Sequence, residues 1–304
     1  MTTVYRGQPL VSIGIPAYNR PENLKATLNC IRKQIYTNIE IIVSDDCSPN
    51  ENVGVVVREA IASGQQIKFY SQLKNIGATR NFEFVLNQAT GKYFFWAEDE
   101  DLFEPEFVAK LVECMESQPD LVACTCDMKT IDFNDKFLEI HELKTIRPSA
   151  NWDEVRKHFF CYPTSNIFFC VLGMFKTDCL RKANINYLAG WNGYETNGEV
   201  PFLAQISTFG RMAAIPEVLK TYRLNPNSIY HTEISLMSDF DLFMLRLVIR
   251  YRLCNIALTS KLPGITKAIL IKTVVVTCVK DKVDNYRYSF GKIKKKILSS
   301  FFDK

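Results

Sequence analysis

The sequence predicts an α/β protein with a mostly parallel, doubly wound sheet flanked by helices, followed by a C-terminal helical extension. Two observations predict this fold class. Over residues 10–127, short β-rich apolar runs alternate with segments whose apolar residues recur at helical spacing. From about residue 231 onward, only helical patterns are found. Since parallel strands need long crossovers, the alternation predicts strands that are joined through helices.

Each expected strand of the first half ends at turn-forming residues and is followed by a helix. Proline is tolerated in the first turn of a helix, so Pro21 is expected to open the first one. The apolar residues that follow have the spacing that buries one face of a helix. The strands are expected at residues 10–15, 39–43, 67–70 and 93–97, and the helices between them at 21–35, 53–62 and 78–89.

The pattern is less regular after Pro105, which is expected to open a further helix. Residues 130–150 are mixed in character and predict a loop or a β-ribbon. The remaining strands are expected at residues 121–127, 167–174 and 217–222, and the remaining helices at 152–160, 177–183 and 199–208.

The composition excludes several classes of protein. A net charge of +4 over 304 residues argues against a dedicated nucleic-acid binder, so no nucleic acid is expected as a partner. The ten cysteines form no CxxC pair, and we interpret them as reduced thiols of a cytosolic protein. No signal-peptide pattern opens the chain, and no uncharged apolar run of about 18 residues predicts a transmembrane helix.

The acidic stretch after the strand at residues 93–97 is the strongest functional signal. Glu98, Asp99, Glu100 and Asp101 are consecutive carboxylates, and because they repel one another a fold that fixes them needs a counter-charge. Ligands of α/β sheets bind at the carboxyl ends of strands, and Mg²⁺ is typically held by one or two carboxylates and substrate phosphates. The stretch therefore predicts a site for a metal and a diphosphate. A solvated acidic loop is the alternative.

Two other strand ends carry side chains that suit a nucleotide. Tyr18 follows the first expected strand, and Asp45 and Asp46 follow the second. An aromatic ring can stack on a base, and a carboxylate can accept a hydrogen bond from a base N–H or a ribose hydroxyl. Taken singly, Tyr18 fits a packing residue and the aspartates fit a turn. Because all these loops are expected at one edge of a parallel sheet, their joint occurrence predicts a nucleotide site.

Four blocks of sequence, in this order along the chain, resemble the family 2 glycosyltransferases. They are Val-Ser-Ile-Gly-Ile-Pro-Ala-Tyr-Asn-Arg at 11–20, Asp-Asp-Cys-Ser at 45–48, Asn-Ile-Gly with Thr-Arg-Asn within 75–81, and the Gly-Lys-Tyr to Pro block at 91–105. The resemblance covers roughly residues 8–230. It implies the GT-A nucleotide-sugar fold and inverting transfer of a sugar from a nucleoside diphosphate sugar, most commonly a uridine diphosphate sugar.

The resemblance implies a role for each residue at the expected donor site. Tyr18 would stack on the base, and Asp46 would bind the base with Asp45 close by. Arg80 would approach the donor phosphates or brace the acidic loop; a surface helix charge is the alternative. The nucleotide-sugar-binding residues expected in this way are Pro16, Ala17, Tyr18, Arg20, Asp45, Asp46, Arg80, Asp99 and Glu100.

The resemblance also implies a divalent metal cofactor, Mn²⁺ or Mg²⁺. The acidic motif of the family usually ends about four residues before a proline, which points to Glu98, Glu100 and Asp101. The literal Asp-x-Asp is Asp99-Glu100-Asp101, one register away. We expect the metal ligands among Asp101, Glu100 and Asp99. A glutamate at a usual aspartate position extends the reach of the carboxylate and shifts the metal geometry or weakens metal dependence.

Inverting transfer needs a carboxylate that takes the proton of the acceptor hydroxyl. The resemblance places this base at Glu199, where an aspartate is more common; Glu195 is the second candidate, and a glutamate favoured by the helix dipole is the structural alternative. The loop before it holds Trp191, Asn192 and Tyr194, which suit an acceptor sugar or a packed aromatic turn. The acceptor implied is a saccharide or a lipid-linked saccharide of a surface polysaccharide.

The resemblance also divides the chain. Residues 1–230 are expected to form the GT-A domain, with a nucleotide-sugar-binding half at 1–127 and an acceptor half at 128–230, and residues 231–304 the helical extension. The basic, apolar end at 292–302 suits contact with an anionic membrane surface, or packing on its own domain or on a partner subunit of a homo-oligomer. The expected location is the cytoplasm, with peripheral contact at the inner face of the membrane.

Three alternative functions are weighed against the resemblance. A non-catalytic nucleotide-sugar binder is motivated by the glutamates at the metal and base positions. A sugar nucleotidyltransferase usually needs a glycine-rich phosphate loop, and residues 16–21 contain no glycine. A dinucleotide-dependent dehydrogenase needs a GxGxxG motif, which does not follow the first expected strand.

Overall fold

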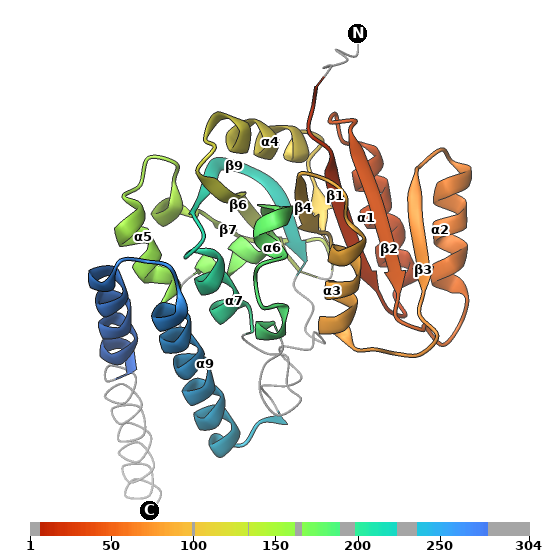
Figure 1. Ribbon diagram of the computed structural model, residues 1–304. Helices are drawn as coiled ribbons and strands as arrows, with labels where there is room; N and C mark the ends of the chain where they lie inside the picture. The colour runs from red at the N-terminus through yellow and green to blue at the C-terminus, as the bar shows by residue number, and fades with distance from the viewer. Residues whose placement is uncertain are drawn as a thin grey trace, which may run out of the picture.

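The computed structural model describes residues 7–98, 101–132, 134–161, 166–188, 198–223 and 236–278. In this part of the chain the strands form one sheet in the order β3-β2-β1-β4-β8-β6-β9-β5, with β7 paired to β6 (Figure 1). The strands are β1 (Val11–Ala17), β2 (Ile39–Asp45), β3 (Ile67–Ser71), β4 (Tyr93–Trp96), β5 (Leu102–Phe103), β6 (Leu121–Ile131), β7 (Phe137–His141), β8 (Met174–Lys176) and β9 (Arg211–Arg223).

Helices cover both faces of this sheet (Figure 1). The α-helices are α1 (Pro21–Arg32), α2 (Asn52–Ala62), α3 (Ala78–Gln88), α4 (Phe107–Ser117), α5 (Trp152–Phe159), α6 (Thr177–Leu180), α7 (Glu199–Ile206) and α9 (Asp239–Thr259). Within the described ranges, short 3₁₀ helices lie at Lys144–Ile146, Asn166–Leu172 and Ile185–Tyr187, and a further α-helix spans residues 264–278.

Most strands run parallel, as the alternating pattern predicts. β1 pairs in parallel with β2 and β4, and β2 with β3. β6 and β9 form another parallel pair, and β8 joins the two halves of the sheet as an antiparallel strand. The carboxyl ends of β1, β2 and β4 therefore lie at one edge. The expected fold class, a mostly parallel sheet flanked by helices with helices at the C-terminal end, is confirmed.

The alternation of side chains along β4 shows how the sheet separates two cores. Phe94 and Trp96 point into the core that α3, α5, α7 and α9 cover, whereas Tyr93, Phe95 and Ala97 point into the core under α1, α2 and α4. All five are buried, because both faces of the strand are covered by helices.

Strands β6 and β9 are longer than expected. The strand predicted at 217–222 in fact begins at Arg211 and continues through Pro216. Between Cys126 and Asp127 of β6 the paired residue of β9 jumps from Ile215 to Val218. This irregularity accommodates the proline, which cannot donate to the ladder, and the sequence pattern breaks at the same place.

The strand expected at residues 167–174 is wrong over most of its length. Asn166–Leu172 forms a 3₁₀ helix, and only Met174–Lys176 joins the sheet as β8. A short continuous apolar run has no periodicity that separates a strand from a buried helical segment. Residues 130–150, expected as a loop or β-ribbon, contain the antiparallel pairing of β6 with β7.

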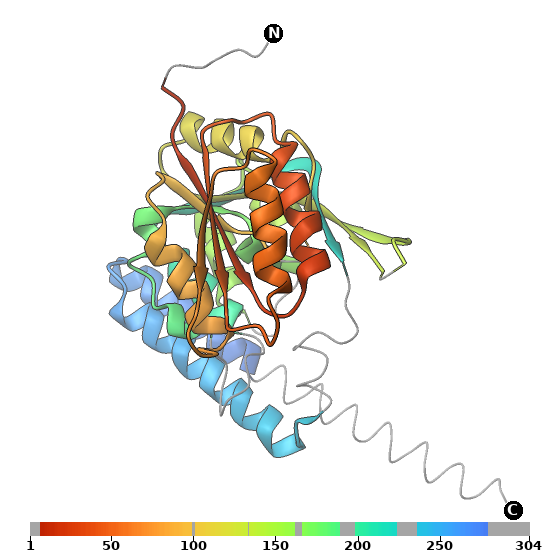
Figure 2. The same ribbon diagram turned by 90° about the vertical axis from the view of Figure 1, so that its right-hand side faces the viewer.

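The C-terminal helices pack on the face of the domain that carries α7 (Figure 2). α9 begins with a capping box, in which Ser238 Oγ accepts from Asp241 N and the Asp241 carboxylate accepts from Ser238 N. Leu245, Ile249 and Leu253 of α9 join the same core as Phe202 of α7. Among the described residues, no helix has the length and apolar character that crossing a membrane requires.

Candidate nucleotide-sugar site

The loops that follow β1, β2 and β4 meet at one edge of the sheet. Ala17 and Asp45 are partners in the β1–β2 ladder, and Asp46 N donates to Ala17 O at 2.9 Å just beyond it. On the other side of β1, Ala97 N donates to Gly14 O at 3.0 Å. The structure therefore brings Tyr18, the aspartate pair and the start of the acidic stretch together, as expected for parallel strands.

Tyr18 is the exposed aromatic residue of this edge. Its side chain is 49% exposed, although it lies between the buried Ala17 and the turn at Asn19. Asn19 has a φ of 55°, a left-handed conformation that asparagine tolerates better than most residues. Its N–H donates to Ser48 Oγ at 2.8 Å, which ties the loop after β1 to the loop after β2. The arrangement leaves the tyrosine ring accessible to a planar ligand.

Asp45 organises the loop after β2. Its Oδ1 accepts hydrogen bonds from Ser48 N at 3.2 Å and from Ser48 Oγ. Cys47, between them, has a φ of 60°. The Asp-Asp-Cys-Ser motif thus folds back on its own first carboxylate, and this explains why aspartate and serine are needed at that spacing.

Asp46 anchors a third loop at the same edge. Its Oδ1 accepts from Ile76 N at 2.7 Å and its Oδ2 from Gly77 N at 3.0 Å. Gly77 has a φ of 87°, which favours glycine at this position. These bonds hold the start of α3 beside the edge, with Arg80 exposed in its first turn. Asp46 therefore lies at this edge with its carboxylate already shared with the backbone, and Arg80 lies exposed on the helix that follows the anchored loop.

Hydrogen bonds hold together the two described ends of the acidic stretch, which we call the acidic turn. Asp101 N donates to Glu98 O at 3.2 Å, and Glu98 N donates to Asp101 Oδ2 at 3.1 Å. Thr27, buried on α1, donates to Glu98 O at 3.2 Å and to Asp101 O at 3.4 Å. Asp99 and Glu100 lie outside the described residues. Within those that are described, no group of three or more His, Cys, Asp or Glu residues is placed to hold a metal ion.

Asp101 forms an ion pair that the sequence does not reveal. Lys220 Nζ lies 2.7 Å from Asp101 Oδ2, and both side chains are at most 2% exposed. The ammonium also donates to Leu172 O at 3.2 Å and lies 5.1 Å from the centre of the Phe103 ring. A counter-charge to the acidic stretch is expected on electrostatic grounds, and part of it is this lysine. Nothing in its neighbourhood on β9 distinguishes it from an ordinary solvent-facing lysine of a strand.

Glu199 is the first residue of α7. Burial raises the pKa of its carboxyl above the ordinary value. Phe202, one turn further along, contacts Trp96 at the end of β4, with 6.1 Å between the ring centres. This contact places the start of α7 close to the strand that leads into the acidic turn. The predicted acceptor residues Trp191, Asn192 and Tyr194, and the alternative base Glu195, lie outside the described residues.

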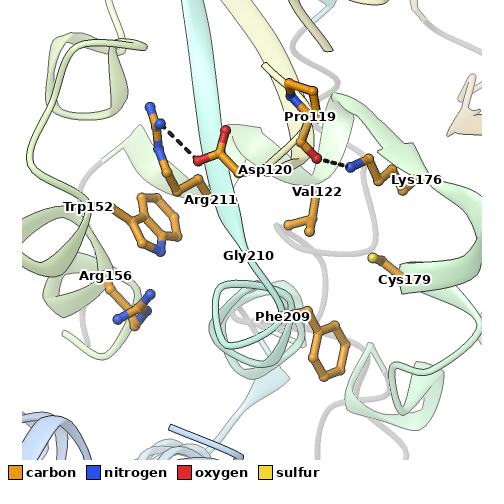
Figure 3. A pocket seen from close by; sticks show the side chains of 10 residues that line it. All are labelled: Pro119, Asp120, Val122, Trp152, Arg156, Lys176, Cys179, Phe209, Gly210 and Arg211. Atoms are coloured by element: carbon orange, nitrogen blue, oxygen red, sulfur yellow. Dashed lines mark hydrogen bonds and ion pairs between the residues drawn. The ribbon is translucent and has the colours of Figure 1, made fainter. Parts of the chain in front are cut away.

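A hollow of about 450 Å³ lies elsewhere on the molecule (Figure 3). It lies where β6 and β9 begin, at the sheet edge opposite to the acidic turn. Its cations have local partners: Arg211 pairs with Asp120 at 2.9 Å, and Lys176 Nζ donates to Pro119 O at 2.5 Å. The lining residues are Pro119, Asp120, Val122, Trp152, Arg156, Lys176, Cys179, Phe209, Gly210 and Arg211. None of the predicted site residues lines it.

The family model "Glycosyl transferase family 2" matches residues 12–180, more than half of the sequence, and the chain belongs to that family. The expectation of a glycosyltransferase is thereby confirmed.

Curated relatives agree with this assignment. An uncharacterized glycosyltransferase of Haemophilus influenzae is 26% identical over 235 residues, which are 74% of this chain and 69% of the relative. An uncharacterized glycosyltransferase of Rickettsia conorii is 32% identical over 106 residues, which are 35% of this chain but only 17% of that protein.

Two solved structures share the fold. S. aureus TarS 1–349 in complex with UDP-GlcNAc has a TM-score of 0.65 at 16% identity, with 88% of this chain and 72% of that chain covered. The mannosyltransferase PcManGT from Pyrobaculum calidifontis, in complex with GDP-Man and Mn²⁺, has a TM-score of 0.53 at 15% identity, with 92% and 88% covered.

Proposed function

We propose that this glycosyltransferase moves a sugar, with inversion, from a nucleoside diphosphate sugar to a saccharide or lipid-linked saccharide acceptor in surface polysaccharide synthesis. A uridine diphosphate sugar is the proposed donor. The observation that carries the proposal is the meeting of Tyr18, the Asp45–Asp46 pair and the acidic turn at one sheet edge. The nucleotide sugars bound by the two structural neighbours support it.

The loop after β1 and the aspartate pair would hold the nucleoside. The exposed Tyr18 ring offers a stacking face for the base, and Pro16, Ala17 and Arg20 would complete that loop around the donor. Each carboxylate oxygen of Asp46 accepts a hydrogen bond from a backbone amide, and each can accept one more. It would therefore receive a base or ribose donor in a fixed orientation, with Asp45 holding the adjacent turn.

The acidic turn supplies hard oxygen ligands for Mn²⁺ or Mg²⁺, and the chemistry of this donor set fits such an ion. Because Asp101 Oδ2 already accepts from Lys220 and from Glu98 N, we propose that Asp99 and Glu100 contribute the principal ligands and that Asp101 mainly holds the turn. The bound ion would stabilise negative charge on the departing diphosphate. Arg80, exposed at the start of α3, would approach the same phosphates.

Glu199 would take the proton of the acceptor hydroxyl as that oxygen attacks the anomeric carbon. A carboxylate whose pKa is raised by burial is a stronger base than an exposed one, which favours this transfer near neutral pH. The loop with Trp191, Asn192 and Tyr194 would present the acceptor sugar to it. Residues 1–230 would then form the catalytic domain, in a donor half (1–127) and an acceptor half (128–230), and residues 231–304 the extension.

The experiment that tests this function measures release of nucleoside diphosphate from a panel of donors, with and without Mn²⁺. We expect metal-dependent release with one donor and its loss in Asp46→Ala and Glu199→Gln. Asp178→Ala, which removes an exposed carboxylate on α6, is the matched control and should keep wild-type release. Donor binding without release across a broad acceptor panel would instead support a non-catalytic nucleotide-sugar binder. This alternative is favoured by the Asp101 carboxylate, because its Oδ2 already pairs with Lys220 and accepts from Glu98 N.

A further inference from the structure

Helix α9 is apolar on two opposite faces. One face, with Leu245, Ile249, Leu253 and Ile256, is buried in the domain core. The other carries large apolar side chains at intervals of three, four or seven residues, so that they line up along the helix axis in the solvent. This exposed stripe, which includes the 71% exposed Tyr251, consists of Phe240, Phe243, Leu247, Tyr251 and Leu258.

The following helix, residues 264–278, repeats this arrangement. Leu270 and Val274 are buried in the same core, whereas Ile265, Ile269, Val275 and Val276 are exposed, Ile265 by 80%. Lys267 Nζ of this helix donates to Leu258 O at 2.9 Å, and the two helices lie side by side in both views (Figures 1 and 2). We call the exposed apolar residues of both helices the outer face of the hairpin. A soluble monomer rarely exposes so many large apolar side chains together.

Beyond the first turn of α9, which carries Asp239 and Asp241, the charges of the hairpin are of one sign. Between residues 242 and 278 the sequence has no Asp or Glu and six cations: Arg246, Arg250, Arg252, Lys261, Lys267 and Lys272. Lys261, in the turn between the helices, and Lys272, between Ile269 and Val275, are exposed. Beyond that first turn the surface is apolar with cations and no carboxylates, which is complementary to a layer of anionic headgroups over hydrocarbon.

The same charges disfavour the other occupants of this face. Two copies that met through it would bring twelve cations together against only four carboxylates, those of Asp239 and Asp241 in each hairpin. Residues 279–304, the adjacent part of the chain, carry eight Lys or Arg and three Asp, so they would add charge of the same sign. A negatively charged lipid surface is the occupant that matches both the apolar side chains and the cations of the outer face.

We propose that the outer face of the hairpin docks this protein on an anionic membrane surface, with the helices lying in the plane of the headgroups. α9 begins on the side of the molecule to which the carboxyl ends of β1, β2 and β4 point (Figure 1). It also packs on α7, whose first residue is Glu199. Docking would therefore set the acceptor side of the site beside the bilayer. This last step rests on the proposed function; the docking itself does not.

The test is sedimentation of the full-length chain with phosphatidylcholine vesicles that contain either no anionic lipid or about one third phosphatidylglycerol. We expect binding to the anionic vesicles only, and at least about a tenfold loss of binding in Phe243→Ser/Tyr251→Ser, since both side chains would leave the headgroup region. The control Ile35→Ser/Leu73→Ser removes two exposed apolar side chains from other surfaces and should bind as the wild type does. Lys261→Gln/Lys272→Gln should weaken binding and its salt dependence.

Each alternative has its own outcome. Unchanged vesicle binding in Phe243→Ser/Tyr251→Ser would overturn the proposal and assign binding to another part of the chain, such as the basic residues 292–302. A dimer in analytical ultracentrifugation that the same double substitution dissociates would overturn it in favour of self-association. The nucleoside diphosphate binding of the variants is measured in parallel, so that failure of docking and failure of the proposed donor site are told apart.

Discussion

The buried pair of Asp101 and Lys220 makes the sharpest prediction about stability. Lys220→Met keeps the length of the side chain but leaves the Asp101 carboxylate without its cation. Both groups are at most 2% exposed, so water cannot replace the lost partner. Removing one partner of a buried ion pair costs about 3–5 kcal/mol, chiefly because the remaining charge stays buried. Urea unfolding of Lys220→Met should show a loss of that size.

Two further variants make this prediction specific. Asp101→Leu/Lys220→Met removes both charges, and since apolar replacement of a buried pair is often neutral, we expect it to recover most of the loss. Lys129→Met breaks the exposed pair with Glu104, 3.4 Å apart, and should cost no more than about 1 kcal/mol. The reasoning is refuted if Lys220→Met is as mild as Lys129→Met, or if the double variant is as unstable as the sum of its two single variants.

Three other predictions follow from the site and its surroundings. Asp46→Ala leaves the Ile76 amide without its acceptor and the Gly77 amide with only Asn75 Oδ1, and should destabilise the fold by about 1–3 kcal/mol, measured by urea unfolding against Asp178→Ala. Because burial raises the pKa of Glu199, the protonated form is favoured in the folded state. The acid limb of kcat/KM should therefore lie above the ordinary glutamate pKa, and wild-type stability relative to Glu199→Gln should fall as pH rises through the raised value. Burial raises the pKa of Glu40, but hydrogen bonds from Lys68, Ser12 and Thr90 outweigh it and lower the pKa to about 2. The stability that Glu40 contributes should be present above about pH 4.5 and disappear toward pH 2, a loss that acid titration of Glu40→Gln should not show.

The fold was predictable from the sequence where local patterns and tertiary structure agree. The first three strands and their helices lie within a few residues of the expected ranges, and α2 ends just before Gly64, whose φ of 98° suits a turn. The first strand was expected to stop at residue 15, but β1 continues through Pro16 to Ala17, because both residues still pair with β2. The sequence pattern fails to predict two places. One is the irregular pairing of β9 at Pro216, and the other is the 3₁₀ helix at Asn166–Leu172, where a strand was expected.

The residues of the candidate site likewise fall into those that the sequence could place and those that it could not. Tyr18 and Asp46 could be placed at one edge from strand order alone, since parallel strands present their carboxyl ends together. Lys220 could not be found, because its role depends on pairing between β5 and β9, more than a hundred residues apart in sequence. The hydrogen bonds of Asp46 to the loop before α3 likewise depend on tertiary contacts that no local pattern encodes.

The most direct test of the donor site is calorimetric titration of uridine diphosphate in the presence and absence of Mn²⁺. One site built from three loops should bind the ligand more tightly with the metal, and both Tyr18→Ala and Asp46→Ala should weaken this binding about tenfold or more. Equal affinity with and without Mn²⁺, together with wild-type affinity in both variants, would contradict a single cleft for the base and the diphosphate.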